Sequence, residues 1–214
     1  SNLSQIKLVP YIYFLRYRVF FIRRILMEYI TPILTTQRLI LRPLSVEDAQ
    51  EMFHNWASDA KVTKYLTWAA YQYEHEVKER LRFREKRYQN KEILDWGLVV
   101  KETNTLIGTI TVVEYDENIG TMEIGYAIGR PWWHKGYTSE AFSRVITYLF
   151  EHYSWLNRIE ASHDVNNPNS GKVMQKCGLQ FEGILRQKGK NNCGIVDIAM
   201  YAILRKDYLP QNNP

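Results

Sequence analysis

The sequence is poor in cysteine, in long apolar runs and in metal-binding patterns, and each shortage excludes a class of protein. Its 214 residues include two cysteines, Cys177 and Cys193, which form no Cys-x-x-Cys pair. Two such cysteines exclude a disulfide scaffold and fit a reducing, cytoplasmic location. The longest apolar run in the first third, about Leu8 to Leu15, is far short of the roughly 20 residues that a membrane span needs. The five histidines show no metal-ligand spacing with one another or with the cysteines, so we expect no bound metal.

Acidic residues are missing from the start of the chain, and their absence places all of the net charge there. Residues 1–27 contain five basic side chains and no acid, which accounts for the whole formal charge of +5. The rest of the chain is electrically balanced, so its pI gives little reason to expect a nucleic-acid binder.

The first 30 residues also interleave Tyr, Phe, Ile and Arg, without turn residues after Pro10. Three interpretations stay open. The segment is an amphipathic helix that meets a membrane or RNA, an ordered or frayed extension, or a targeting peptide. Arg16 and Arg18 interrupt any apolar core of a targeting peptide, and no small-residue cleavage site follows them.

The remainder has the composition of one globular domain. A hydrophobic fraction of 45%, with six Trp and fifteen Tyr, excludes a disordered chain, and the length suits a single core. We divide the chain into a basic, aromatic-rich extension at 1–34, a domain at 35–210 and a tail at 211–214, with 1–27 as a candidate contact for a ribosome or a membrane surface.

From Thr35 the patterns of strands and helices alternate. Strands are expected at 38–44, 96–102, 106–114, 122–129, 158–163, 182–188 and 195–204, and helices at about 45–56, 73–88, 139–152 and 169–177. Short turns separate the middle strands, which favours antiparallel pairing. We therefore expect an α/β (α+β) fold, with a mixed, mostly antiparallel sheet of about seven strands and about four flanking helices.

A strand, a short loop and the start of a helix follow one another between Glu123 and Ala141. A loop that enters a helix N-terminus offers unpaired N–H groups and about +0.5 of a charge from the helix dipole. Gly136 lets the backbone approach a phosphate closely where a side chain would collide. His134 and Lys135 can add donors. The arrangement predicts an anion site, although many loops share it.

Within this segment, the run from Trp133 to Ala141 resembles the acetyl-CoA signature of the GNAT superfamily of N-acetyltransferases, which reads Gln/Arg-x-x-Gly-x-Gly/Ala. The preceding Glu123-Ile-Gly-Tyr126 resembles the Rim-type (RimJ/RimL-like) branch, which acetylates the N-termini of ribosomal proteins. In that branch Trp commonly takes the first position, as Trp133 does here. Thr138 departs from the signature, since Gly or Ala is usual there.

A second block follows in the order found in relatives. Asn167-Pro-Asn-Ser170 and residues 173–179 resemble the family's Asn-x-x-Ser…Lys-x-Gly-Phe block, whose Asn and Ser contact the pantetheine arm of acetyl-CoA. The resemblance covers about Thr36 to Tyr208. It implies the GNAT fold, in which two middle strands of the sheet splay apart.

The resemblance also implies where acetyl-CoA binds. The pantetheine amides are expected to bond to the exposed backbone of the splayed strand, and the pyrophosphate is expected on the amides of the loop. The cofactor-binding residues implied in this way are Tyr126, Ala127, Ile128, Trp133, His134, Lys135, Gly136, Tyr137, Thr138, Asn167 and Ser170.

Acetyl transfer to an amine needs a group that removes a proton and a group that stabilises the negative charge on the carbonyl oxygen. Glu123 is the candidate base, directly or through a water, with a cross-strand ion pair as its alternative role. Many relatives protonate the leaving thiolate with a Tyr, but Met174 stands at that position, so Ser170 is the candidate acid. A backbone N–H near Ala127 or Ile128 is the candidate for stabilising the charge on the carbonyl oxygen.

Three other residues have roles that the sequence leaves open. Cys177 is expected to pack in a helix rather than act as a nucleophile. Asp197 and Tyr201 are candidate substrate-side groups, and a turn-capping role is the alternative for Asp197.

The expected activity is acetyl-CoA-dependent N-acetylation of a protein N-terminal α-amine, in particular that of a ribosomal protein. One alternative acceptor is a small amine, such as a polyamine or an aminoglycoside. The other alternative is a non-catalytic acyl-CoA-binding module. Loops around 59–72 and 187–195 are expected to shape the acceptor pocket, but they carry no readable code for the acceptor.

Overall fold

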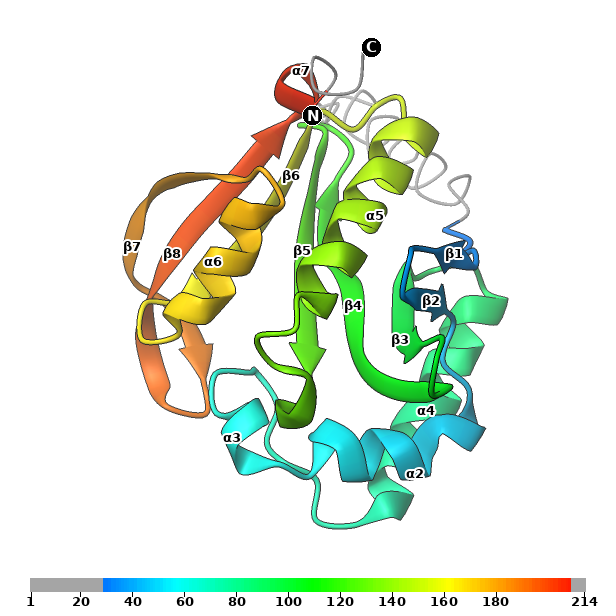
Figure 1. The fold of residues 1–214 in the computed structure, drawn as a ribbon. Helices are drawn as coiled ribbons and strands as arrows, with labels where there is room; N and C mark the ends of the chain where they lie inside the picture. Colours follow the sequence, from blue (N-terminus) through cyan, green and yellow to red (C-terminus); the bar gives the residue numbers. More distant parts are fainter. Residues whose placement is uncertain (1–28, 209–214) are drawn as a thin grey trace, which may run out of the picture.

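One eight-stranded sheet organises the computed structural model, which describes residues 29–208 (Figure 1). The predictions made for residues 1–28 and for the tail at 211–214 lie outside the described residues. In spatial order the strands are β1 (Leu34–Thr35), β2 (Leu39–Arg42), β3 (Asp95–Val100), β4 (Thr105–Asp116), β5 (Thr121–Ile128), β6 (Arg158–Asp164), β8 (Gly194–Leu204) and β7 (Gln180–Asn191). Only β5 and β6 pair in parallel, and the other neighbours are antiparallel. The α/β architecture expected from the sequence is confirmed, with the two-residue β1 as an additional strand.

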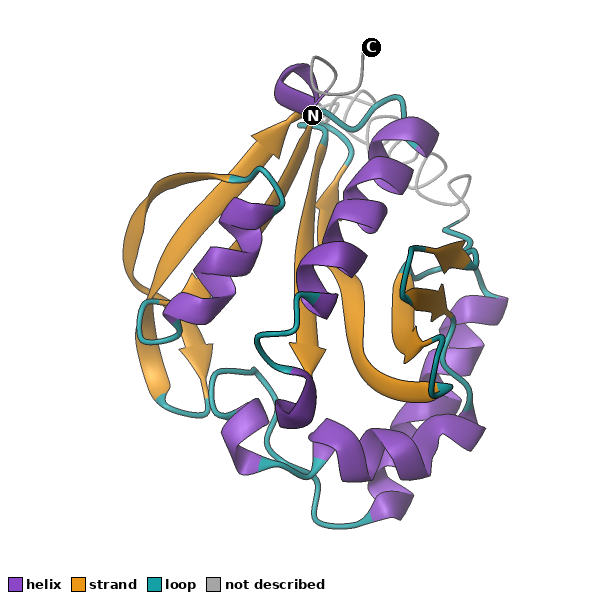
Figure 2. Ribbon diagram, viewed as in Figure 1, coloured by secondary structure: helices purple, strands orange, loops and turns teal. Residues whose placement is uncertain are grey.

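Helices cover both faces of this sheet (Figure 2). The α-helices are α2 (Ala49–Met52), α3 (Ala60–Thr63), α4 (Glu74–Gln89), α5 (Tyr137–His152), α6 (Pro168–Lys176) and α7 (Arg205–Tyr208). The helix expected at 45–56 is built from a 3₁₀ turn (Val46–Asp48), α2 and a π-helical turn (Phe53–Ala57). The four-residue helices α3 and α7 are too short to leave a helical period in the sequence.

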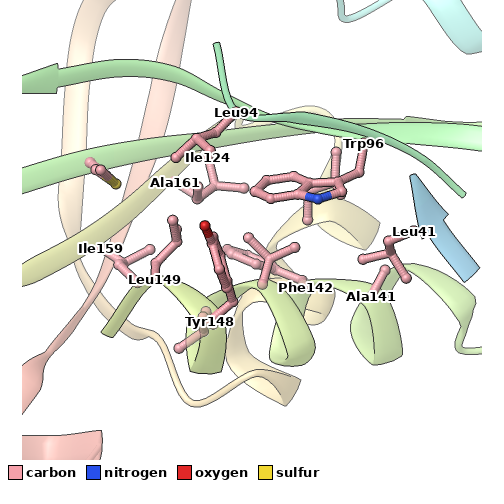
Figure 3. Packing of buried hydrophobic residues seen from close by; sticks show 14 of the residues in the cluster. Leu41, Leu94, Trp96, Ile124, Ala141, Phe142, Tyr148, Leu149, Ile159 and Ala161 are labelled. Atoms are coloured by element: carbon pink, nitrogen blue, oxygen red, sulfur yellow. The ribbon is translucent and has the colours of Figure 1, made fainter. Parts of the chain in front are cut away.

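Two hydrophobic cores hold the layers together. On one face, α5 buries Phe142 and Leu149 against Trp96, Ile124 and Ile159 of the strands (Figure 3). On the other face, α2 and α4 pack over β2, β3 and β4. Alternate residues of β3 point to the two cores, as the period of two in a strand requires.

The first described residues belong to this packed body. Tyr29 is 4% exposed, and its hydroxyl donates to Glu117 at 2.8 Å. The indole N–H of Trp96 donates to the carbonyl of Pro32 at 2.8 Å. Residues 29–34, expected from the sequence to belong to the N-terminal extension, therefore contact the domain expected at 35–210.

The pairing of β5 with β6 ends early, and this shapes the middle of the sheet. The two strands pair over three positions, from Thr121 opposite Arg158 to Glu123 opposite Glu160. Beyond Glu123 they diverge, as Figure 1 shows. The register of β4 shifts around Val113, across from the same point of β5. Such a bulge increases the local twist of a strand pair, which gives a physical reason for the divergence.

Candidate active site

The start of α5 presents backbone N–H groups that have no partner. The first main-chain bond of the helix runs from the N–H of Glu140 to the carbonyl of Gly136 at 3.0 Å. The N–H groups of Tyr137, Thr138 and Ser139 precede that bond and lie free, as the first turn of a helix leaves them. Within the described residues, none of the N–H groups from 134 to 139 has a main-chain acceptor.

The loop before α5 has the conformation that this cradle needs. Gly136 has a φ of +80°, and His134 has a φ of +60°. A Cβ on Gly136 would meet only the Arg38 guanidinium, at 3.5 Å, so glycine is required by the positive φ rather than by crowding. His134 and Lys135 are exposed, whereas Thr138 is buried. The unpaired amides, the room at Gly136 and the helix dipole fit the pyrophosphate of acetyl-CoA.

Arg38, directly before β2, ties this loop to α5. Its Nη1 donates to the carbonyl of Lys135 at 3.0 Å, and its Nε donates to Oε2 of Glu140 at 2.7 Å. The guanidinium also lies over the ring of Tyr137, 4.3 Å from its centre. Partial burial tends to raise the pKa of Glu140, but hydrogen bonds from Thr36 and Arg38 outweigh it and lower that pKa. No pattern in the sequence predicts this contact.

The free edge of β5 offers main-chain groups toward the gap. The N–H of Gly129 donates to the carbonyl of Ile107 on β4 at 2.9 Å. Because hydrogen-bonded pairs alternate in an antiparallel ladder, the N–H of Ala127 also points to β4, while those of Tyr126 and Ile128 point toward the gap. The two candidate donors to the carbonyl oxygen of the thioester were the N–H groups of Ala127 and Ile128, and this geometry leaves the N–H of Ile128. The indole N–H of Trp133 donates to the carbonyl of Ile128 at 2.8 Å, which agrees with this orientation.

Glu123 lies where β5 leaves β6, on the sheet face opposite α5 and α6. The hydroxyl of Ser162 donates to its Oε1 at 3.0 Å. Burial raises the pKa of Glu123, and the negative charges of Glu160 and Glu114 add to that rise, while the bond from Ser162 lowers it. The net effect is a pKa above the ordinary value, which suits a group that must accept a proton near neutral pH. Glu123 has no cation partner among the described residues, so the alternative role in an ion pair is not observed.

Ser170 lies on the other face, in the first turns of α6. Its Oγ and the phenol of Tyr126 form a hydrogen bond of 2.9 Å, and the same phenol lies 2.9 Å from the carbonyl of Ser170. Asn167 caps the helix, and its N–H donates to the carbonyl of Asp164 at 2.7 Å. The side-chain amide of Asn167 makes no hydrogen bond within residues 29–208 and is free to meet a ligand. The structure thus brings Ser170, Tyr126 and Asn167 to one side of the gap and Glu123 to the other.

The residues with open roles also have definite places. Met174, on α6, is buried in the hydrophobic core. Burial raises the pKa of the Cys177 thiol to about 11, so it stays protonated and packs, as expected. Oδ1 of Asp197 accepts the N–H of Gln187 at 2.8 Å, which is the turn-holding alternative. Tyr201 is buried against His163 and Phe181 and does not face the acceptor side.

Two further properties concern the described residues alone. Residues 29–208 contain no group of three or more His, Cys, Asp or Glu side chains placed to hold a metal ion. In the same range, no helix is both long enough and apolar enough to cross a membrane.

Comparison with known proteins agrees with this geometry. A family model described as an acetyltransferase (GNAT) domain matches residues 38–180. The uncharacterized N-acetyltransferase p20 of Bacillus licheniformis is 34% identical over 175 residues, which cover 82% of this chain and 97% of p20. A GNAT-family acetyltransferase of Bacillus anthracis has a similar structure, with a TM-score of 0.71 and 27% identity over 82% of this chain and 99% of that one. RimL, a ribosomal L7/L12 α-N-protein acetyltransferase solved with coenzyme A, shares the fold with a TM-score of 0.71 and 17% identity, covering 80% of this chain and 97% of RimL.

Proposed function

The chain belongs to the GNAT family of acetyltransferases, and on that premise we propose that its acceptor is the N-terminal α-amine of a protein. Acetyl-CoA supplies the thioester whose carbonyl carbon the amine attacks. Glu123 takes the proton of the attacking amine, directly or through a water. The N–H of Ile128 stabilises the negative charge on the carbonyl oxygen. Ser170 donates toward the leaving sulfur.

The observation that carries the proposal is a base with a raised pKa on an open sheet face. The helices that pack against β6 and β8 lie on the opposite face or at the strand ends. Ser162 and Met200 on the side of Glu123 are partly exposed. A polypeptide end can therefore reach Glu123 without passing through a closed pocket.

Proton energetics favours the same acceptor. The nucleophile must be neutral, and an α-amine has a pKa near 7.7–8.0, whereas a Lys or polyamine amine lies near 10.4. At pH 7, deprotonation costs roughly 1 kcal/mol for the first and about 4–5 kcal/mol for the second. One carboxylate base without a partner cation or a tyrosine acid on α6 suits the easier substrate.

A small polyamine is the second candidate, because three carboxylates form a row across the sheet. Glu114 and Glu160 lie opposite Glu123 on the two neighbouring strands, and this row would attract a cation. Glu160, however, is paired with Arg158 at 2.6 Å. The only acid of the loop at 59–72, Asp59, is paired with Arg130. Two of these four acids are thus already paired, which leaves Glu114 and Glu123 as the unpaired carboxylates that a polyamine could meet among the described residues.

The experiment compares kcat/KM for three groups of acceptor at one pH. The groups are peptides with an unblocked N-terminal Ala or Ser, a polyamine such as spermidine, and an aminoglycoside. Mass spectrometry locates the acetyl group. We expect peptides to react fastest and to carry the acetyl group on the α-amine. Inert peptides with turnover of spermidine would refute the protein-acceptor proposal and leave acetyl transfer intact.

A further inference from the structure

A chain of contacts joins the carboxyl ends of β5 and β6 through α3 and the turn between β7 and β8. Arg130, two residues after the end of β5, is paired with Asp59, the residue that caps α3. At the other end of α3, the side-chain amide of Asn192 donates to the carbonyls of Thr63 and Trp68, at 2.8 Å each. In Figure 1, α3 correspondingly lies between the end of β5 and the tip of the β7–β8 hairpin.

Asp164 closes this chain at the end of β6. Its Oδ2 accepts from Nδ2 of Asn191 at 2.8 Å. Its Oδ1 accepts from the N–H and the Nδ2 of Asn166, at 2.8 and 3.0 Å. We use "the bridge" for the contacts from Arg130 through Asp59, α3 and the turn to Asp164. The bridge spans the end of the gap into which the free edge of β5 faces.

The carboxylate of Asp164 is a costly group to bury and is accordingly well satisfied. It is 4% exposed, and an ionised carboxylate at such a site needs several hydrogen bonds. Burial tends to raise the pKa of Asp164, but the bonds from Asn166 and Asn191 outweigh it and lower that pKa. A charged group held from two directions resists displacement of either partner.

We propose that Asp164 is a positioning residue that fixes the β7–β8 turn to the end of β6, so that the acceptor side of the gap keeps one geometry for acetyl transfer. The inference rests on acetyl transfer as the proposed function, but not on which amine is the acceptor. Asp164 also precedes the turn that leads to Asn167, so one residue borders both the acetyl-CoA side and the acceptor side of the gap.

The orientation of the Asn191 amide makes the contact specific. Oδ1 of Asn191 accepts the N–H of Cys193 at 2.7 Å, so the amide cannot reverse without losing that bond. Asp164→Asn therefore places one NH₂ group against another at the Asn191 contact. The bonds of its other oxygen to Asn166 can persist, because an Asn oxygen accepts as an Asp oxygen does.

Asp116 provides a matched control. Its Oδ1 accepts from the N–H and Nδ2 of Asn118 at 2.8 and 3.1 Å, the same pair of bonds that Asp164 makes with Asn166. Asp116 is exposed at the β4–β5 turn and has no third partner among the described residues. Asp116→Asn thus reports the effect of the substitution on such a turn without the bridge.

The experiment uses the full chain and whichever amine it acetylates. In Asp164→Asn, we expect the acceptor KM to rise about tenfold or more, the size that follows from weakening bonds to a charged group. Acetyl-CoA affinity, measured by calorimetry, should change less than about threefold because the turn before Asn167 persists. Amide hydrogen exchange at 191–193 should accelerate. Asp116→Asn should leave all three quantities unchanged.

A reciprocal exchange tests the contact itself. In Asp164→Asn/Asn191→Asp, the new Asn donates to the new Asp, whose second oxygen still accepts the N–H of Cys193. The double variant should recover the acceptor KM and the slow exchange. Asn191→Asp alone opposes two carboxylates and should resemble Asp164→Asn, which keeps the test available if Asp164→Asn does not fold.

Two results would overturn the inference. One is an unchanged acceptor KM with unchanged hydrogen exchange in both single variants. The other is a double variant that folds and shows no recovery. If no amine is acetylated by the wild-type chain, the proposed function fails, while hydrogen exchange still decides whether the bridge holds the turn.

Discussion

Replacing Glu123 by Gln is the most direct test of the proposed mechanism, because it removes the proton acceptor and keeps the shape. The amide oxygen of Gln can still accept the hydroxyl of Ser162, which lies 3.0 Å from the carboxylate. Loss of a general base lowers kcat by about 10²–10⁴-fold, which corresponds to roughly 3–5 kcal/mol of barrier at 1.36 kcal/mol per tenfold. Acetyl-CoA affinity should hardly change.

This substitution should not lower the stability of the fold at neutral pH. Burial raises the pKa of Glu123, so folding favours its protonated form. Its contribution to stability is then greatest below the unfolded pKa and is lost as pH rises through the folded pKa. At pH 7 a neutral Gln should therefore leave the unfolding temperature equal to or above that of the wild type. Lower activity together with lower stability would point to misfolding instead.

Two neighbours of Glu123 should move the acid side of the pH–rate profile in opposite directions. The bond from Ser162 lowers the pKa of Glu123, so Ser162→Ala should raise that pKa and shift the rising limb to higher pH. The charge of Glu160 raises the same pKa, so Glu160→Gln should shift the limb to lower pH. The acceptor amine titrates identically in every variant and does not affect the comparison. Above the limb, both neighbours should approach wild-type kcat, whereas Glu123→Gln should not.

The assay is initial-rate release of CoA thiol against pH, at saturating acetyl-CoA and acceptor. Wild-type turnover in Glu123→Gln would refute the role of the base. Shifts of the same sign in the two neighbouring variants would show that the limb belongs to another group.

Three further predictions concern other parts of the molecule. Gly136→Val forces a branched side chain to a φ of +80° and should weaken acetyl-CoA binding by about fivefold or more by calorimetry, as strain of 1–3 kcal/mol implies; unchanged affinity would move the phosphate site elsewhere. Tyr126→Phe removes the phenol 2.9 Å from Oγ of Ser170 and should lower kcat more than acetyl-CoA affinity, with Tyr201→Phe as the control; equal effects in both would refute the role of Ser170. Removing residues 1–27, which hold the whole formal charge, should weaken binding to ribosomes or anionic vesicles in a sedimentation assay and spare acetylation of short acceptors; unchanged binding would assign that contact to the domain.

The parts of the site that were predictable from the sequence are those encoded within one short segment. The helix expected at 139–152 is α5, which begins at Tyr137, because its apolar stripe and the preceding glycine lie within a few turns of each other. The predicted ends of the strands were less accurate. β7 and β8 run to Asn191 and from Gly194, so the expected turn at 189–194 shrinks to two residues. Gly189, which lies between the two strands expected at 182–188 and 195–204, instead pairs with Val196 within the sheet.

The unpredicted parts are contacts between residues far apart in the chain. Arg38 meets Glu140 across 102 positions, and Asn192 meets Thr63 across 129. Neither pair leaves a periodic or local signal, since an exposed arginine or a turn asparagine has many alternative roles. The opposite faces of Glu123 and Ser170 also follow only from strand register, because a slip of one residue reverses every side chain.

Trp133 shows how the structure explains a departure from a family pattern. The signature position usually holds Gln or Arg, whose side chains are flexible donors. Here the indole N–H donates to the carbonyl of Ile128 at 2.8 Å, and the residue as a whole is 37% exposed. The tryptophan therefore fastens the loop before α5, the proposed phosphate site, to the end of β5, and it bonds a carbonyl that would otherwise face the gap. The N–H of Ile128 then remains the free donor at that position, and the loop is held at its two ends by Trp133 and Arg38. A loop that is anchored at both ends can present its amides to a phosphate without a charged side chain at the first signature position. This gives a physical reason why Trp can replace Gln or Arg there.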